Sequence, residues 1–255
     1  MEITNLVGLG DIHGNFGEVI DVIERMDLRD MYILQVGDFG MYNSLTILGD
    51  NIDNLDSVLK ERNIFLYAIR GNHDDPIYFK GDSFKVESEY VTCEADMYGL
   101  KFIQNATNII LVPDYTVLEL LGKRILCVGG AVSVDRSKLK EGYNYWSGEE
   151  LEYNWEKLKD IHDINILCMH TLPESIYFNF GLNIKPKFVK QQLVDDPYLA
   201  ADLDKELKEA EKIFKHVNTG QELKFYCGHF HKSLSTSFDN VAATILDINE
   251  FKMII

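Results

Sequence analysis

The sequence has few cysteines, and none of them is paired. Four cysteines occur in 255 residues, and no two stand in a C-x-x-C spacing. Structural zinc sites favour such pairs, so their absence disfavours a site of that kind. Cys127, Cys168 and Cys227 each lie at or near the end of an apolar, strand-like run. We therefore expect buried thiols in a reducing compartment.

Basic side chains are also scarce. Lysine and arginine number 25 against 41 aspartates and glutamates, which gives a formal net charge of -16. A surface of this charge repels an extended phosphate backbone, so the composition disfavours nucleic acid as a partner. A locally cationic site could still admit a small phosphate.

Long apolar runs are missing as well. No stretch reaches the length of a transmembrane helix, and the first residues, MEITNLVGLGD, carry neither a basic region nor a cleavable apolar run. We expect a cytoplasmic protein without a membrane partner. The sequence leaves its oligomeric state open.

No internal repeat and no low-complexity linker divides the chain. With 46% hydrophobic residues, a chain of this length can bury a sizeable core. We predict a single domain over residues 1–255, with a helical or irregular insertion around 171–220. The insertion ends in the charged pattern AADLDKELKEAEKIFKHV, whose alternating charges predict a helix with a solvated face.

Short apolar runs alternate with helical patterns near the start of the chain. NLVGLG (5–10), MYILQVG (31–37) and IFLYAIRG (64–71) are typical of buried strands. FGEVIDVIERM, between the first two, has the spacing of an amphipathic helix, and a second helix is predicted before Asn63. This order predicts an α/β fold with a parallel sheet, whose ligands bind beyond the carboxyl ends of the strands.

Further elements are predicted in the rest of the chain. TVLELLGKRILCVGGAVSV indicates two strands around a turn at Gly122 and Lys123, and hence a sheet that is not purely parallel. Residues 147–161 predict a helix with Ser147 as its N-cap and Glu150 three residues on. Strand-like runs close the chain at 222–227, 241–247 and 250–255.

Polar stretches follow five of the strand-like runs: GDIHGN (10–15), GDFG (37–40), RGNHDD (70–75), MHT (169–171) and GHFH (228–231). Five of the seven histidines lie in them. The carboxyl ends of strands in an α/β sheet converge on one crevice, so we expect these groups to meet. Residues two apart in extended chain point to the same side. We therefore expect each of two pairs to contribute both side chains to one site: Asp11 with His13, and His229 with His231.

Each stretch alone has a simpler interpretation. A single histidine is more often a surface or core residue than a ligand, and GNHD by itself is compatible with a turn and a helix cap. The occurrence of metal-ligand types at five strand ends together favours the functional interpretation.

In this order, the five stretches resemble the signature blocks of the calcineurin-like metallophosphoesterase superfamily, and they span residues 10 to 231. The resemblance implies a four-layer α/β/β/α sandwich of two mixed β-sheets with a two-metal centre. Asp38 would bridge the two ions. The first ion would also take Asp11, His13 and His231, and the second Asn72, His170 and His229. Imidazole and oxygen ligands suit manganese, iron or zinc better than calcium, and we expect manganese to be the activator.

The resemblance also implies a reaction. Phosphomonoester or phosphodiester bonds would be hydrolysed by in-line attack of a hydroxide held between the metals. His73 matches the family's general acid, and an imidazole titrates near neutrality, as that role requires. Asp74, next to it, is expected to be a turn carboxylate, and the alternative is that it orients His73.

The second block departs from one branch of the family. Protein serine/threonine phosphatases continue it as Asp-x-x-Asp-Arg-Gly, whereas Met41 and Tyr42 stand at the Asp-Arg positions here. The sequence is more similar to a small bacterial or phage-type phosphoesterase.

Other residues must then contact the substrate. Arg136 and Tyr143, on a glycine-rich connection, are candidates for the phosphate and for stacking on a base or sugar, and Asn15 is a further candidate. The alternative is that Asp135 pairs with Arg136 and that the aromatic side chains are core.

Three functions remain open. The first is a dimetal hydrolase of small, nucleotide-like phosphate esters. The second is a binding scaffold that kept the fold and lost catalysis. The complete ligand set and the presence of His73 argue against this function. The third is a DNA-processing nuclease, which the acidic composition and the lack of basic tracts disfavour.

Overall fold

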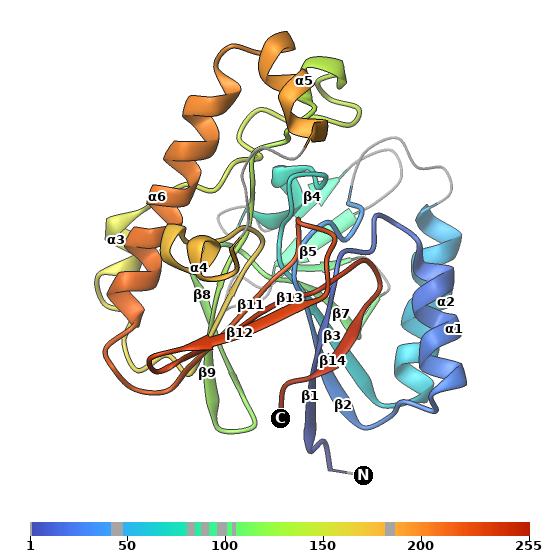
Figure 1. The fold of residues 1–255 in the computed structure, drawn as a ribbon. Coiled ribbons are helices and arrows are strands. Elements are labelled where there is room, and N and C mark those ends of the chain that lie inside the picture. Colours follow the sequence, from blue (N-terminus) through green and yellow to red (C-terminus); the bar gives the residue numbers. More distant parts are fainter. Residues whose placement is uncertain are drawn as a thin grey trace.

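The computed structural model describes residues 2–41, 48–80, 85–87, 92–95, 101–103, 106–181 and 187–255. Over these ranges the strands form two mixed sheets (Figure 1). The larger sheet has the order β14 (Phe251–Met253), β1 (Asn5–Leu9), β2 (Met31–Gln35), β3 (Ile64–Ala68), β7 (Ile109–Leu111), β6 (Lys101–Ile103), β5 (Thr92–Ala95), β4 (Lys85–Glu87). The smaller has the order β12 (Leu234–Phe238), β13 (Val241–Ile245), β11 (Leu223–Cys227), β10 (Ile166–Met169), β9 (Lys123–Val128), β8 (Thr116–Leu120).

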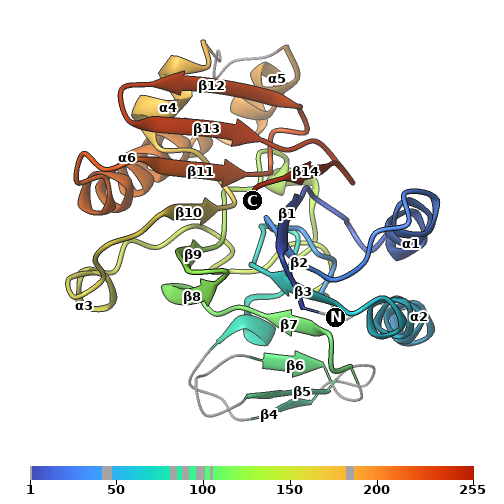
Figure 2. The ribbon, with the colours of Figure 1, turned by 90° about the horizontal axis from the view of Figure 1, so that it is seen from below.

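The helices lie outside the two sheets. Figures 1 and 2 show α1 (Phe16–Arg25) and α2 (Leu48–Glu61) on the side of the larger sheet. On the side of the smaller sheet lie α3 (Trp155–Leu158), α4 (Glu174–Asn179), α5 (Lys187–Asp195) and α6 (Leu199–Val217). In the described ranges, no helix is long and apolar enough to cross a membrane.

Three apolar cores separate the four layers. One core joins α1 and α2 to the larger sheet, and a second joins the smaller sheet to α4 and α6. The third lies between the sheets. Because side chains alternate along a strand, Leu167 of β10 points into the core under α6 while Ile166 and Cys168 point between the sheets. The predicted four-layer sandwich of two mixed sheets is confirmed.

The parallel strands run in one direction within each sheet. β1, β2 and β3 are parallel neighbours, as predicted, and β10 is parallel to both β9 and β11. The turn at Gly122 joins the antiparallel pair β8 and β9, which confirms the predicted hairpin. Strand β12 and strands β4–β7 were not predicted.

The predicted helix over 147–161 is wrong. The structure has only α3 at Trp155–Leu158, and Asn154 caps it by accepting a hydrogen bond from the backbone N–H of Lys157 at 3.2 Å. The preceding backbone is held in another conformation because Arg70 donates to the carbonyls of residues 148, 149 and 150. Tertiary hydrogen bonds therefore override the local helical pattern.

Helix α6 is present as predicted, but it is not simply a solvated helix. Glu206 and Glu211 are buried. Glu206 accepts hydrogen bonds from the backbone N–H of Val132 and from the hydroxyl of Thr171, and burial raises its pKa to about 7. The helix thus ties together the loops that follow β9 and β10. Residues 182–186 of the predicted insertion lie outside the described residues, and the domain boundaries stay a prediction.

Candidate metal centre

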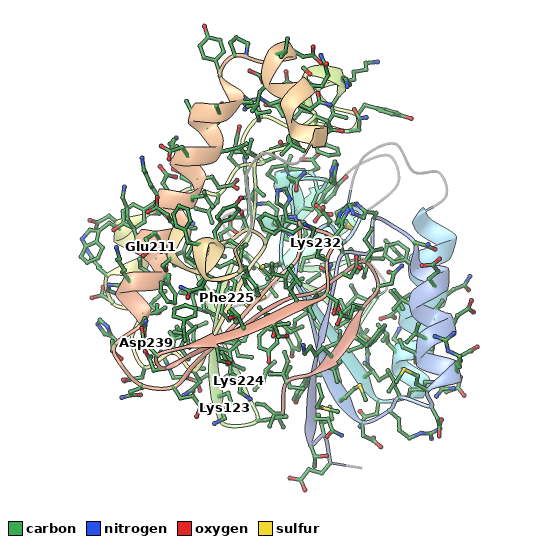
Figure 3. All side chains as sticks on the ribbon, in the orientation of Figure 1. Lys123, Glu211, Lys224, Phe225, Lys232 and Asp239 are labelled. Atoms are coloured by element: carbon green, nitrogen blue, oxygen red, sulfur yellow. The ribbon has the colours of Figure 1, made fainter. Side chains whose placement is uncertain are left out.

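The loops at the carboxyl ends of five parallel strands meet at one place. Strands β1, β2 and β3 of the larger sheet and β10 and β11 of the smaller sheet supply them. Figure 3 shows Lys232 toward this end of the sheets, and Lys123 and Lys224, which lie at the starts of β9 and β11, toward the other end. Close packing of the loops requires glycine: a Cβ at Gly71 would collide with Asp38, and one at Gly228 with Asp11.

The first donor set consists of Asp11, His13, Asp38 and His231. One ligand atom from each lies within 4.8 Å of the others. The Nε2 atom of His231 is 3.1 Å from Oδ2 of Asp11 and 3.2 Å from Nε2 of His13. His13 Nε2 is in turn 3.8 Å from Oδ2 of Asp38. The side chain of His231 is 45% exposed, so solvent can reach this set.

The second donor set consists of Asp38, Asn72, His170 and His229. Oδ1 of Asn72 lies 3.1 Å from Nε2 of His170 and 3.0 Å from Nδ1 of His229. His170 Nε2 is 3.4 Å from Oδ2 of Asp38. The carboxylate of Asp38 therefore belongs to both sets.

Both donor sets have the chemistry of a transition-metal site. Each combines two imidazoles with oxygen donors, a mixture that suits manganese, iron or zinc. Ligand bonds of about 2.0–2.2 Å place two donors of one ion about 3–4 Å apart, which is the range of the separations above. The residues present thus fit a pair of divalent ions.

Burial and charge oppose each other in the second donor set. Burial disfavours ionisation of Asp38, yet the neighbouring His170 holds the pKa of that carboxyl well below its usual value. Burial also disfavours protonation of His170, but the Asp38 charge raises its pKa to about 9. Burial and the charge of His170 lower the pKa of His229 to about 3. The buried carboxylate thus attracts positive charge to the point where a cation would lie.

The backbone of the ligand loops is not extended. His13, Asp38, His229 and His231 have positive φ angles of 49°, 54°, 65° and 47°, a conformation that costs a non-glycine residue about 1–2 kcal/mol. The expected extended geometry is therefore wrong at His13, His229 and His231, although Asp11 and His13 still share the first donor set. The turns send His229 and His231 to different donor sets. Such strained positions are typical of functional sites.

The carboxylate of Asp74 bonds the loop that follows β2 to the loop that follows β3, and among the described residues no hydrogen bond joins it to the neighbouring His73. Its buried carboxylate accepts hydrogen bonds from the backbone N–H groups of Phe39, Gly40 and Met41 and, within its own loop, of Gly71. Burial, together with the Asp38 charge, raises the pKa of Asp74. Asp74 is thus the turn carboxylate that the sequence predicts. It also connects its own loop, residues 71–74, to the loop that carries Asp38.

His73 lies beside the first donor set. Its backbone N–H donates to Oδ1 of Asp38 at 2.8 Å, and its ring centroid is 5.4 Å from that of His13. The side chain is partly exposed. His73 thus reaches solvent next to the proposed ligands, with no donor atom in either set.

The three residues predicted to contact the substrate are Arg136, Tyr143 and Asn15, and they differ in exposure and in partners. Arg136 pairs with Asp196 and Asp202 of the α5–α6 region, not with Asp135. Tyr143 is 53% exposed, and Asn15 precedes α1 without capping it through its side chain. Arg136 therefore already has two carboxylate partners, and a role on phosphate for these residues stays a prediction. Tyr42 lies outside the described residues.

Three residues that support the ligands were missed in the sequence. The backbone carbonyl of Val36 lies 2.8 Å from Nδ1 of His170. The hydroxyl of Ser133 accepts a hydrogen bond from Nδ2 of Asn72 at 2.9 Å, and Glu149 accepts from the backbone N–H of Ser133 at 2.9 Å. Ser133 comes after the carboxyl end of β9, a sixth strand. Its position there is the sequence signal that could have identified it as a site residue.

Comparisons with known proteins identify a family and similar folds. A family model described as calcineurin-like phosphoesterase matches residues 4–255. The solved structure of TT1561 of Thermus thermophilus is similar, with a TM-score of 0.54 at 13% identity over 96% of this chain and 90% of that chain. Phosphopantetheinyl hydrolase from Mycobacterium tuberculosis gives a TM-score of 0.49 at 11% identity over 99% of this chain and 97% of that chain. None of the curated proteins matches the chain. At 13% identity, the likeness to TT1561 concerns the fold alone.

Proposed function

The chain belongs to the calcineurin-like phosphoesterase family, and from that premise we propose that it is a dimetal-dependent hydrolase of small, nucleotide-like phosphate esters. The observation that carries the proposal is the position of Asp38. Its Oδ2 atom is 3.8 Å from Nε2 of His13, in the first donor set, and 3.4 Å from Nε2 of His170, in the second. A single buried carboxylate can thus serve both donor sets.

The two sets would hold one ion each. Asp11, His13 and His231 would complete the first, and Asn72, His170 and His229 the second. Bound there, two divalent ions would supply a water of lowered pKa and neutralise charge on the phosphoryl oxygens.

The chain's own residues supply the rest of the chemistry. Asp38 is anchored by the backbone N–H of His73 at 2.8 Å, which fixes the shared carboxylate. The His73 imidazole, partly exposed beside the first donor set, would donate a proton to the leaving oxygen of the ester. Since His231 and His13 are themselves partly exposed, a small ester would have access to the first donor set, beside which His73 lies.

A metal-supplemented activity screen tests the proposal. The full chain is stripped with a chelator, reloaded with Mn²⁺, Fe²⁺ or Zn²⁺, and assayed on a bis-aryl phosphodiester, an aryl phosphomonoester and a panel of mononucleotides. We expect turnover that requires the added ion, with manganese giving the highest rate, and that disappears again when the chelator returns.

Two outcomes would contradict it. A chain that retains no metal and turns over no ester with any ion would favour the scaffold function. Cleavage of single- or double-stranded DNA at a rate well above that of every small ester would favour the nuclease, against the net charge of -16.

A further inference from the structure

The amide of Asn72 has a defined direction. Its Nδ2 donates to Oγ of Ser133 at 2.9 Å, while its Oδ1 faces His170 and His229 at 3.1 and 3.0 Å. The direction matters because the two ends of an amide differ: the oxygen can bind a cation, whereas the NH₂ group carries two hydrogens and repels one. A flipped Asn72 would present the wrong end to the second donor set.

Ser133 by itself cannot set this direction. A hydroxyl can donate or accept, so it can pair with either end of the amide. If its hydrogen is taken by another acceptor, Oγ becomes an acceptor toward Asn72, and only the NH₂ end of the amide can then face it.

Glu149 provides that acceptor. Its Oε1 accepts from the backbone N–H of Ser133 at 2.9 Å, and the Ser133 hydroxyl is near enough to the carboxyl group to favour its charged form. Glu149 and Ser133 are 0% and 1% exposed, so water does not compete for these bonds. The contacts therefore run from Asn72 through Ser133 to Glu149, and a hydroxyl hydrogen that Ser133 gives to Glu149 points away from the metal ligand.

The position of Glu149 is fixed by the loop that carries Asn72. Arg70, two residues before Asn72, donates to the carbonyl of Glu149 at 2.6 Å and to the carbonyls of Gly148 and Glu150. The same Glu149 carbonyl accepts from the backbone N–H of Ala131 at 3.1 Å. The segment around Glu149 is thus held against both the Asn72 loop and the Ser133 loop.

Burying Glu149 has a cost that packing does not explain. Its Oε2 has no hydrogen-bond partner in the described ranges, and a buried polar atom without a partner costs about 1–3 kcal/mol. Burial raises the pKa of the carboxyl group to about 8. A proton on Oε2 leaves Oε1 free to accept, so the function of Glu149 toward Ser133 needs an acceptor and not a charge.

We propose that Glu149 and Ser133 are positioning residues that fix the direction of the Asn72 amide, so that Oδ1 faces the second metal ion. The inference rests on the proposed function, because it takes Asn72 as a ligand of that ion.

The test is calorimetric titration of Mn²⁺ into the chelator-stripped full chain. Glu149→Met removes the acceptor at similar length, and we expect it to weaken the second ion ~10–100-fold, the usual effect of losing a partner that orients a ligand. Ser133→Ala should weaken it to a similar extent. Glu149→Gln keeps an oxygen acceptor and should bind both ions like the wild type. Thermal unfolding of each metal-free variant checks its fold, and Ser133→Ala carries the test if Glu149→Met does not fold.

The same substitutions in an Asn72→Asp background separate positioning from a purely structural role. A carboxylate has oxygen at both ends, so its direction needs no control, and adding Glu149→Met should then weaken the second ion less than ~3-fold. An equal loss in both backgrounds, or a loss with Glu149→Gln as large as with Glu149→Met, overturns the inference. If both Glu149→Met and Ser133→Ala bind two ions with normal affinity, the positioning inference is overturned while the proposed function stands. A wild-type chain that binds no second ion overturns the proposed function as well.

Discussion

Asp38→Asn should abolish turnover and weaken both metal ions, whereas His231→Ala should weaken mainly one. A unit charge about 4 Å from another contributes about 4 kcal/mol at an effective dielectric constant near 20, and every 1.4 kcal/mol is tenfold in affinity. Removal of the Asp38 charge should therefore cost each ion on the order of 10³-fold. His231 is a neutral ligand of one ion with a half-exposed side chain, so water can replace part of its contribution.

The asparagine variant should still fold. Its Oδ1 can accept the backbone N–H of His73, as that of Asp38 does at 2.8 Å, and its volume is nearly unchanged. Asp239→Asn is the matched control: Asp239 is exposed in the turn between β12 and β13, and Figure 3 shows it at the opposite end of β12 from Lys232. Elemental analysis after desalting gives the metal content. Two retained ions and a near-normal rate in Asp38→Asn would show that the shared carboxylate is wrongly assigned.

His73→Ala should retain both ions and lose rate in proportion to how much the leaving group needs a proton. Loss of a general acid costs ~10²–10⁴-fold when the leaving oxygen must be protonated. We expect a loss of that size on alkyl or nucleoside esters and a much smaller one on nitrophenyl esters, whose leaving group departs as a stable anion. The metals should stay because His73 anchors Asp38 through its backbone N–H, which alanine keeps.

The measurement compares rates across esters whose leaving groups differ in pKa, with metal content measured on the same samples. His162→Ala, which removes an exposed imidazole beside His216, is the matched control and should match the wild type on every ester. An equal loss on all esters would reject the acid role of His73. A missing ion would instead make His73 part of the coordination shell.

The strands and the candidate ligands could be predicted from the sequence because their signals are local. Each of β1, β2, β3, β10 and β11 is an apolar run that stops at a polar block. In an α/β sheet, the ends of parallel strands converge, so the blocks predict one site without knowledge of the tertiary contacts. The turn at each histidine could not be predicted this way, since a left-handed residue depends on the hydrogen bonds around it.

Features that depend on distant contacts were not predictable. The helical pattern at 147–161 does not form a helix over its full length, because Arg70 binds backbone carbonyls at its start. Arg70 is 78 to 80 residues away from those carbonyls along the chain. Glu206 and Glu211 look like surface charges in the sequence, yet α6 buries both. The chain from Asn72 to Ser133 to Glu149 spans separations of 61 and 16 residues, and nothing in the local sequence marks its members as partners.

The position of bound manganese tests the central claim most directly. Crystals of the full chain soaked in Mn²⁺ should give two anomalous difference peaks about 3.5–4 Å apart. Oδ2 of Asp38 should lie between them, with Asp11, His13 and His231 around one peak and Asn72, His170 and His229 around the other. A single peak, or peaks away from these seven side chains, would contradict the account.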